Sequence, residues 1–288
     1  MIDIIDSHQH LWDLSRHAHA WCASIPLLNR SFTPDEYAAA AGGISGARVV
    51  AAVHVETDVD EPHMAEETRW VLDLADDPTQ ITNAVVACCR PEASEGGFRR
   101  ALEPFRAHPR LKGVRRVLHT QPDDLSQSSL FRSNVRSLTQ YGLSFDLCVL
   151  ARQLPIAVEL VRACPDVPFV LDHCGVPDVK GKALDPWRSD LKTLADHPNV
   201  IGCKISGLPA YAGDGWTPND LRPFVEHAAE CFGHDRILFG SDWPVCLLTG
   251  DYAEWAGALL GLTRHWSDSD RNKLFSENAR RVYRIEGE

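Results

Sequence analysis

Short runs of apolar residues recur along the chain and alternate with longer amphipathic stretches. Eight runs are rich in β-branched residues and apolar at consecutive positions, which is typical of parallel strands covered on both faces. They begin at intervals of roughly 33 residues, close to the length of one strand–helix unit of a (β/α)8 barrel. The predicted strands lie at residues 2–6, 48–55, 81–87, 111–118, 143–149, 169–172, 200–205 and 237–240.

The stretches between these runs carry helix start signals. Thr33, Pro34 and Glu36 combine an N-cap, a proline at the first helical position and a capping-box acid, and the helix they begin should end at the glycines 42–43. Residues 217–220 repeat this device. Further helices are expected near 62–76, 94–107, 126–141, 151–163, 184–196 and 251–261, with a last one after Ser267.

The regular alternation predicts an α/β fold with a parallel sheet, and eight units favour closure into a (β/α)8 TIM barrel. We expect a single domain over residues 1–288. An open doubly wound sheet is the alternative, but the glycine-rich phosphate-binding fingerprints of its nucleotide-binding versions are absent from the sequence. Two long loops, about residues 11–30 and 207–215, follow the first and seventh strands and should shape a pocket at the carboxyl end of the barrel.

Composition narrows the range of partners. The chain has 40 acidic and 29 basic residues, so nucleic acid is not an expected partner. No apolar stretch is long enough to span a membrane, and the first residues lack the positive segment of a secretory signal. The nine cysteines form no CxxC pair and indicate reduced thiols. We therefore expect a cytoplasmic protein that acts on a small molecule.

Four residues at predicted strand ends could carry chemistry. His8 and His10 are two residues apart, and alternate residues of a strand point to the same side, so both lie on one face of the first strand. His173 ends the sixth strand and Asp242 the eighth. In a closed barrel the first and eighth strands are neighbours, so these residues should meet. They could bind one divalent ion, zinc being the best fit, or act without metal, with Asp242 as general base and the histidines as donors to an oxyanion.

These motifs resemble the amidohydrolase superfamily, in its amidohydrolase-related branch, and within it the sugar-lactone hydrolases of the L-fucono- and L-rhamnonolactonase type. The matching stretches are residues 6–12, 113–117, 173–177, 204–207, 236–246 and 278–283. Binuclear members of the superfamily carry a bridging lysine at the end of the fourth strand and a histidine at the end of the fifth. Here Lys112 begins the fourth strand and the fifth has no histidine. The resemblance therefore implies one metal ion or none.

Other residues should surround these four. The resemblance implies an arginine on the fourth strand that polarises a carbonyl, and we assign it to Arg115 rather than Arg116. Asp146, on the fifth strand, could cap, pair or bind. The candidate substrate contacts are polar groups for hydroxyls and aromatic rings for a sugar face: His54, Glu56, Trp12, Trp21, Trp243 and His119.

The resemblance implies hydrolysis of a sugar-acid lactone, of the L-fucono- or L-rhamnono-lactone type, to the aldonic acid. Asp242 would deprotonate the attacking water, while His8, His10, His173 and Arg115 would stabilise the oxyanion. Two alternatives stay open. One is a metal-dependent, non-oxidative decarboxylase of a small carboxylic acid. The other is a catalytically inactive barrel that serves as a binding protein.

Overall fold

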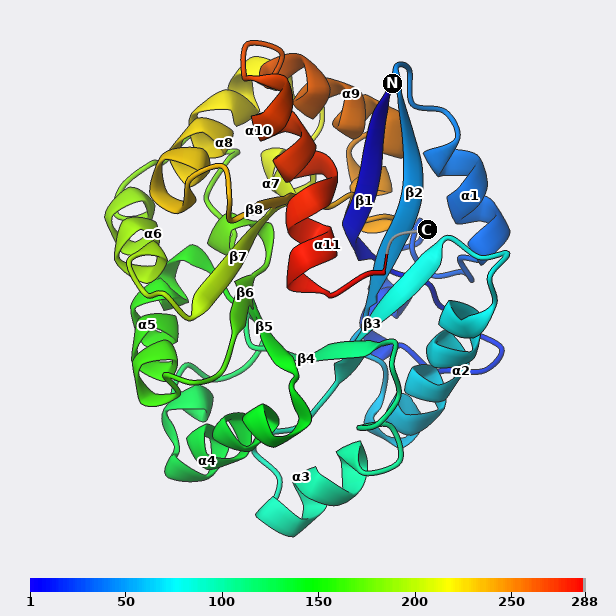
Figure 1. The fold of residues 1–288 in the computed structure, drawn as a ribbon, viewed down its shortest axis with the longest axis vertical. Helices are drawn as coiled ribbons and strands as arrows, with labels where there is room; N and C mark the ends of the chain where they lie inside the picture. The colour runs from blue at the N-terminus through cyan, green and yellow to red at the C-terminus, as the bar shows by residue number, and fades with distance from the viewer. Residues whose placement is uncertain (287–288) are drawn as a thin grey trace.

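Eight parallel strands form one sheet in the order β1 to β8 in a computed structural model, which describes residues 1–286 (Figure 1). The last two residues of the expected 1–288 domain lie outside the described residues. The sheet closes between its first and last strands, because Asp242 N donates to His8 O and His10 N to Trp243 O, each at 2.8 Å. The predicted (β/α)8 barrel is confirmed. The strands are Ile2–Gln9 (β1), Ala47–Val55 (β2), Thr82–Cys88 (β3), Leu111–Val117 (β4), Ser144–Cys148 (β5), Phe169–Leu171 (β6), Val200–Ile205 (β7) and Ile237–Phe239 (β8).

Strand β1 is longer than the predicted 2–6 because its polar residues find partners inside the barrel wall. Asp6 Oδ1 accepts from Ser241 N at 2.8 Å, and its Oδ2 accepts from the hydroxyl of Tyr37 at 2.9 Å. Ser7 Oγ donates to Phe239 O at 2.6 Å. These bonds join the end of β1 to β8 and to the shell outside, so the strand continues as far as the predicted histidines.

Helices surround the ring of strands (Figure 1). The capping box at Thr33 and Glu36 is present at the start of α1, and a second one begins α8. The predicted helix 94–107 stops at Leu102, two residues before Pro104, which cannot continue a helix. The expected loop 207–215 contains a short helix instead, α7. The α-helices are Pro34–Ala41 (α1), Met64–Asp76 (α2), Glu95–Leu102 (α3), Ser129–Ser137 (α4), Leu154–Ala163 (α5), Trp187–Ala195 (α6), Leu208–Ala212 (α7), Pro218–Phe232 (α8), Tyr252–Leu262 (α9), Asp268–Asn272 (α10) and Asn278–Val282 (α11).

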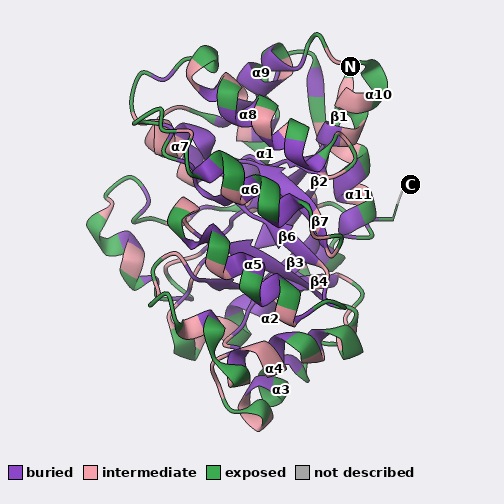
Figure 2. Cartoon of the chain, turned by 90° about the vertical axis from the view of Figure 1, so that its left-hand side faces the viewer, coloured by how far each residue is buried: buried purple, intermediate pink, exposed green. Residues whose placement is uncertain are grey.

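The core has two parts. A large apolar layer lies between the strands and the helices, which bury one face and expose the other (Figure 2). A smaller cluster fills the barrel, where Ile5, Val53 and Val170 meet Val282 and Tyr283 from the C-terminal segment. Helix α11 thus lies across one end of the ring (Figure 1), and the opposite, carboxyl end of the strands is left for the site. Among residues 1–286, no helix combines the length and apolar character needed to cross a membrane.

Candidate active site

Three strand ends converge at the carboxyl end of the barrel. His8 lies on β1 with His10 directly after it, His173 follows β6, and Asp242 follows β8. His173 and Asp242 have positive φ values of 52° and 58°, a left-handed conformation that is costly for a residue with a Cβ atom. Strained backbone of this kind clusters at functional sites. Here it brings both side chains toward the two histidines of the first strand.

The four predicted residues meet at one carboxylate oxygen. Asp242 Oδ1 lies 3.4 Å from His10 Nε2, 3.8 Å from His8 Nε2 and 3.9 Å from His173 Nε2. The Nε2 atoms of His8 and His10 are 3.2 Å apart. All four residues are buried, with relative exposures of 0 to 6%. The barrel therefore assembles three imidazoles and a carboxylate in a site shielded from bulk water.

The outer ring nitrogens are fixed by neighbouring groups. His10 Nδ1 lies 2.7 Å from the carbonyl oxygen of Val55, which can only accept, so Nδ1 carries the proton and Nε2 keeps its lone pair. His173 Nδ1 lies 2.8 Å from Ser206 Oγ. The position after Ser206 requires a glycine. Gly207 has a φ of +68°, and a Cβ atom at this position would lie 2.7 Å from His173 Nδ1.

The donor set fits a single divalent ion. Ligand atoms bound tetrahedrally to zinc at about 2.0–2.1 Å lie about 3.4 Å from one another. The distances among His8 Nε2, His10 Nε2 and Asp242 Oδ1 run from 3.2 to 3.8 Å. The free lone pair of His10 Nε2, with Nδ1 held by a backbone carbonyl, is the usual arrangement of a metal-binding histidine. A second grouping of donor atoms comes from His8, Asp172 and His173.

Two buried cations lie beside the histidines, each between two carboxylates. Arg115 Nε donates to Glu56 Oε1 at 2.6 Å, and its Nη1 donates to Asp172 Oδ2 at 3.2 Å. Lys204 Nζ lies 2.7 Å from Asp146 Oδ2 and 2.9 Å from Asp172 Oδ1. Buried charges are tolerated only when they are paired in this way. We call these five residues the paired group.

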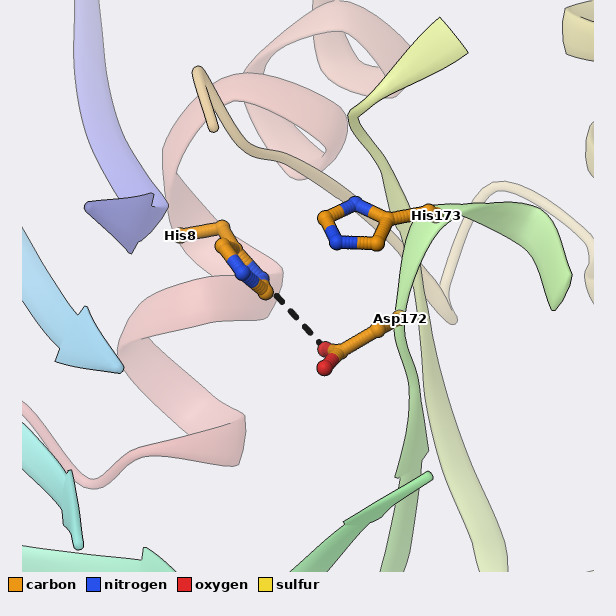
Figure 3. Close-up of side chains that lie close together, drawn as sticks. All are labelled: His8, Asp172 and His173. Carbon is orange, nitrogen blue, oxygen red and sulfur yellow. Dashed lines mark ion pairs between the residues drawn. The ribbon is translucent and has the colours of Figure 1, made fainter. Parts of the chain in front are cut away.

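His8 lies between the paired group and Asp242. Figure 3 shows its contact with Asp172 of the paired group. Its Nδ1 lies 3.2 Å from Lys204 Nζ and 3.3 Å from Asp172 Oδ1. Burial lowers the pKa of His8 well below its ordinary value and the Lys204 charge lowers it further, so the ring is neutral. Burial raises the pKa of Asp172, but Lys204 and His8 outweigh this effect and bring it well below its ordinary value. The network therefore keeps a fixed charge pattern next to a neutral imidazole.

Three of the four residues, His10, His173 and Asp242, line a pocket of about 240 Å³, and Arg115 lines it with them. Arg115 is the one cationic side chain that lines it within the described part of the chain, and its charge is already matched by Glu56 and Asp172. The other lining residues fall into two sets. The apolar and indole side chains are Trp12, Trp21, Ile25, Leu28, Val117, Val245 and Leu248, and the others are Thr57, Asp58, His119, Thr120, Cys148 and Tyr211.

Three of the candidate substrate contacts, Trp12, Trp21 and His119, line this pocket. Trp21 is held there because its indole Nε1 donates to the carbonyl of Thr57 at 2.8 Å. Arg115 points into the barrel, as we assigned, whereas Arg116 Nη2 lies 2.8 Å from the Glu92 carboxylate.

The other three candidate contacts have different surroundings. Glu56 binds Arg115 rather than facing the pocket. His54 is 1% exposed and does not line the pocket. Trp243 is also buried, and its ring packs edge-on against Phe32 and Tyr37 at centroid distances of 5.4 and 5.5 Å. Strand β2 ends at Val55, as predicted, and the residues that line the pocket beside it, Thr57 and Asp58, follow the strand.

Sequence reasoning missed the lysine of the paired group and gave Asp172 no role. Asp172 directly precedes His173, and Lys204 stands in the otherwise apolar seventh strand, which was the available signal. Asp146, for which several roles were open, pairs with Lys204 and also accepts from the Tyr283 hydroxyl at 3.0 Å. Cys148, at the end of β5, lines the pocket although no role was predicted for it.

The amidohydrolase family model matches residues 5–285. The chain belongs to this family. An L-fucono-1,5-lactonase of Burkholderia multivorans is 33% identical over 300 residues, covering 98% of this chain and 96% of the relative. An L-fucono-1,5-lactonase of Burkholderia ambifaria is 28% identical over 291 residues, with the same coverage. The crystal structure of an amidohydrolase from Burkholderia multivorans with bound zinc is 29% identical, covers 98% of this chain and 99% of its own, and superposes with a TM-score of 0.85. This amidohydrolase thus has relatives that are named lactonases and one that holds zinc.

Proposed function

We propose that this amidohydrolase opens an uncharged sugar-acid lactone, of the L-fucono-1,5-lactone or L-rhamnono-lactone type, to the aldonic acid. The observation that carries the proposal is the Asp242 carboxylate, which borders the pocket among three imidazoles. The lactonase names of the two full-length relatives support the substrate class. Trp21, which is half-buried and lines the pocket, offers an aromatic face for a sugar ring, and the buried Trp12 packs edge-on against it at a centroid distance of 5.7 Å.

Charge favours an uncharged substrate. Asp242 and Asp58 both line the pocket, and the Arg115 guanidinium is neutralised by its own carboxylate partners. A substrate carboxylate would therefore meet two negative charges and no unmatched protein cation from the described lining. A decarboxylase, whose substrate must carry a carboxylate, would therefore need the divalent ion to supply the matching charge, whereas a lactonase would not.

In the proposed reaction, Asp242 Oδ1 takes a proton from water as the water oxygen attacks the lactone carbonyl carbon. His10 Nε2, which keeps a lone pair, accepts the second hydrogen bond of that water. Arg115 and His173 face the carbonyl oxygen and stabilise its negative charge. When the ring C–O bond breaks, the departing oxygen receives the proton held by Asp242. The products are a hydroxyl and a carboxylic acid, which releases its proton at neutral pH.

A divalent ion, when bound, would be held by His8, His10, His173 and Asp242, and it would polarise the carbonyl or lower the pKa of water. The roles of Arg115 and of the pocket walls in binding and orienting the lactone are the same with or without the ion. Metal analysis of the purified protein, with activity measured before and after chelation and zinc addition, decides between the two forms.

The test is acid release from a panel of sugar lactones, followed with a pH indicator. Asp242→Asn should lower kcat by about 10²- to 10⁴-fold, the usual contribution of a positioned general base. The matched control is Asp58→Asn, which removes the other pocket carboxylate and should act mainly on KM. Absence of acid release above background from the whole panel would contradict the proposal. Carbon dioxide from an aromatic or enoic acid would favour the decarboxylase instead, and tight lactone binding without turnover the binding protein.

A further inference from the structure

A thiol and an imidazole lie together in the wall of the pocket. Cys148 Sγ lies 3.3 Å from His119 Nδ1, and both residues line the pocket. The backbone strengthens the contact, because the amide N of His119 donates to the Cys148 carbonyl at 3.1 Å, as does that of Leu118 at 3.0 Å. The segment after β4 is therefore fixed on the end of β5, and the ring of His119 is held against the thiol.

The pair has two possible hydrogen patterns. The thiol can donate to His119 Nδ1, which leaves Nε2–H as a donor, or Nδ1–H can point to sulfur, which leaves Nε2 as an acceptor. Cys148 Sγ has one hydrogen-bond contact in the described chain, the one to Nδ1. In the second pattern the S–H proton would have no acceptor, although the thiol is buried. The first pattern satisfies both groups.

Both groups are neutral in this environment. Burial raises the pKa of the Cys148 thiol above its ordinary value. Burial, together with the nearby charge of Arg115, lowers the pKa of His119 to about 4. A thiolate–imidazolium pair is thereby disfavoured, so Cys148 is not poised as a nucleophile. The S–H proton is present to be donated at neutral pH.

We propose that Cys148 is a positioning residue, whose thiol fixes the tautomer of His119 so that Nε2–H donates a hydrogen bond to a substrate hydroxyl. The role of the donor rests on the proposed function, since a polyol lactone supplies the acceptor. The tautomer itself does not depend on any activity. Position 148 thus contributes to substrate recognition through its neighbour and takes no part in the bond-breaking steps.

The first test reads the tautomer directly. Nitrogen-15 NMR of labelled protein should show His119 protonated on Nε2 in the wild type and in Cys148→Ser, whose hydroxyl can donate in the same way. Cys148→Ala should give a mixture of tautomers. A wild-type ring protonated on Nδ1 would overturn the proposal, whatever the enzyme proves to hydrolyse.

The second test uses kinetics on the lactone with the fastest turnover. Cys148→Ala should raise KM about three- to tenfold, the effect expected from one weakened hydrogen bond, while kcat changes less. Cys148→Ser should restore KM. In a His119→Ala background the same Cys148→Ala change should have no further effect, because the thiol acts through the imidazole. Equal effects of Cys148→Ala with and without His119 would show a merely structural role and contradict the proposal.

Cys164→Ala is the matched control. Cys164 is also buried, but its sulfur contacts the carbonyl of Arg132 at 3.6 Å, away from the pocket. Its KM should stay at the wild-type value. If no lactone is turned over by any variant, the proposed function fails while the NMR result still decides the tautomer.

Discussion

Two groups of buried polar residues, which reach the end of β2 through Glu56 and His54, avoid an isolated buried charge in opposite ways. In the paired group, Arg115 and Lys204 each lie within 3.2 Å of two carboxylates. A second group, which we call the unpaired group, consists of His17, His54 and Glu67. Within the described chain, both ring nitrogens of His17 and His54 have no hydrogen-bond partner, and neither has Oε2 of Glu67, whose Oε1 accepts from the backbone N and the hydroxyl of Thr57.

The difference shows two ways to avoid an isolated buried charge. The paired group keeps its charges and matches them, so its stability depends on every member being present. The unpaired group gives up its charges. Burial lowers the pKa of His54 well below its ordinary value, and burial raises the pKa of Glu67 to about 8. Its contribution should therefore depend on pH more than on any one partner.

The largest expected effect comes from removing the cation shared by two carboxylates. Lys204→Met should destabilise the protein by about 3–5 kcal/mol, because Asp146 and Asp172 are left buried with one positive partner fewer. Urea unfolding of the purified variant measures this loss. Adding Asp146→Asn should recover part of it. The control is Lys192→Met, which breaks an exposed ion pair with Asp196 and should cost less than about 1 kcal/mol. Equal losses for the two lysines would contradict the comparison.

A smaller effect is expected when the charge is kept but its geometry is lost. Arg115→Lys cannot reproduce the bonds to Glu56 Oε1 and to the Glu56 carbonyl, both 2.6 Å long. We expect a stability loss of about 1–3 kcal/mol from the unsatisfied acceptors. We also expect kcat/KM on a lactone to fall by about 10²-fold. Arg48→Lys, at an exposed pair with Asp3, should leave both quantities nearly unchanged. Full activity of Arg115→Lys would remove the guanidinium from the proposed mechanism.

The same comparison explains how far the sequence could be interpreted. The meeting of His8, His10 and Asp242 follows from two simple rules, the period of two along a strand and the contact of the first and eighth strands. His173 joins them because all strands of the barrel end at the same face. Both rules need only the order of the elements. The four residues of the predicted cluster could therefore be brought together before any coordinates were known.

The paired group could not be found in this way. Strand β7 is apolar on both faces, so no alternation shows that Lys204 points into the barrel, and its carboxylates come from two other strands. The end of β2 at Val55 was predicted correctly, but the sequence did not show which residues beside it reach the pocket. His54 was placed at the mouth, whereas Thr57 and Asp58, which follow the strand, are the residues that line the pocket there.

Glu67 of the unpaired group allows a test of how stability depends on pH, at pH values above the ordinary pKa of a glutamate. A carboxyl whose folded-state pKa is raised binds more protons when folded, so its contribution is fully present below the unfolded pKa of about 4.5 and is lost as pH rises toward about 8. Relative to Glu67→Gln, the wild type should lose stability across this window by up to about 1.4 kcal/mol per pH unit. Unfolding free energies of both proteins at pH 5, 6, 7 and 8 measure this. Glu103→Gln, at an exposed acid, should run parallel to the wild type.

The smallest effect is expected at His54. At pH 7, His54→Leu should change stability by less than about 1 kcal/mol, because no hydrogen bond among the described residues is lost. Because the pKa of His54 is lowered in the folded state, the unfolded chain binds more protons than the folded chain at acidic pH. Wild-type stability should therefore fall as pH drops below about 6.5. The variant should lose less, and the difference should reach about 1 kcal/mol near pH 5.5. His265→Leu, at an exposed ring, should show no such divergence. A large loss at neutral pH would mean that His54 has a partner after all and belongs with the paired group.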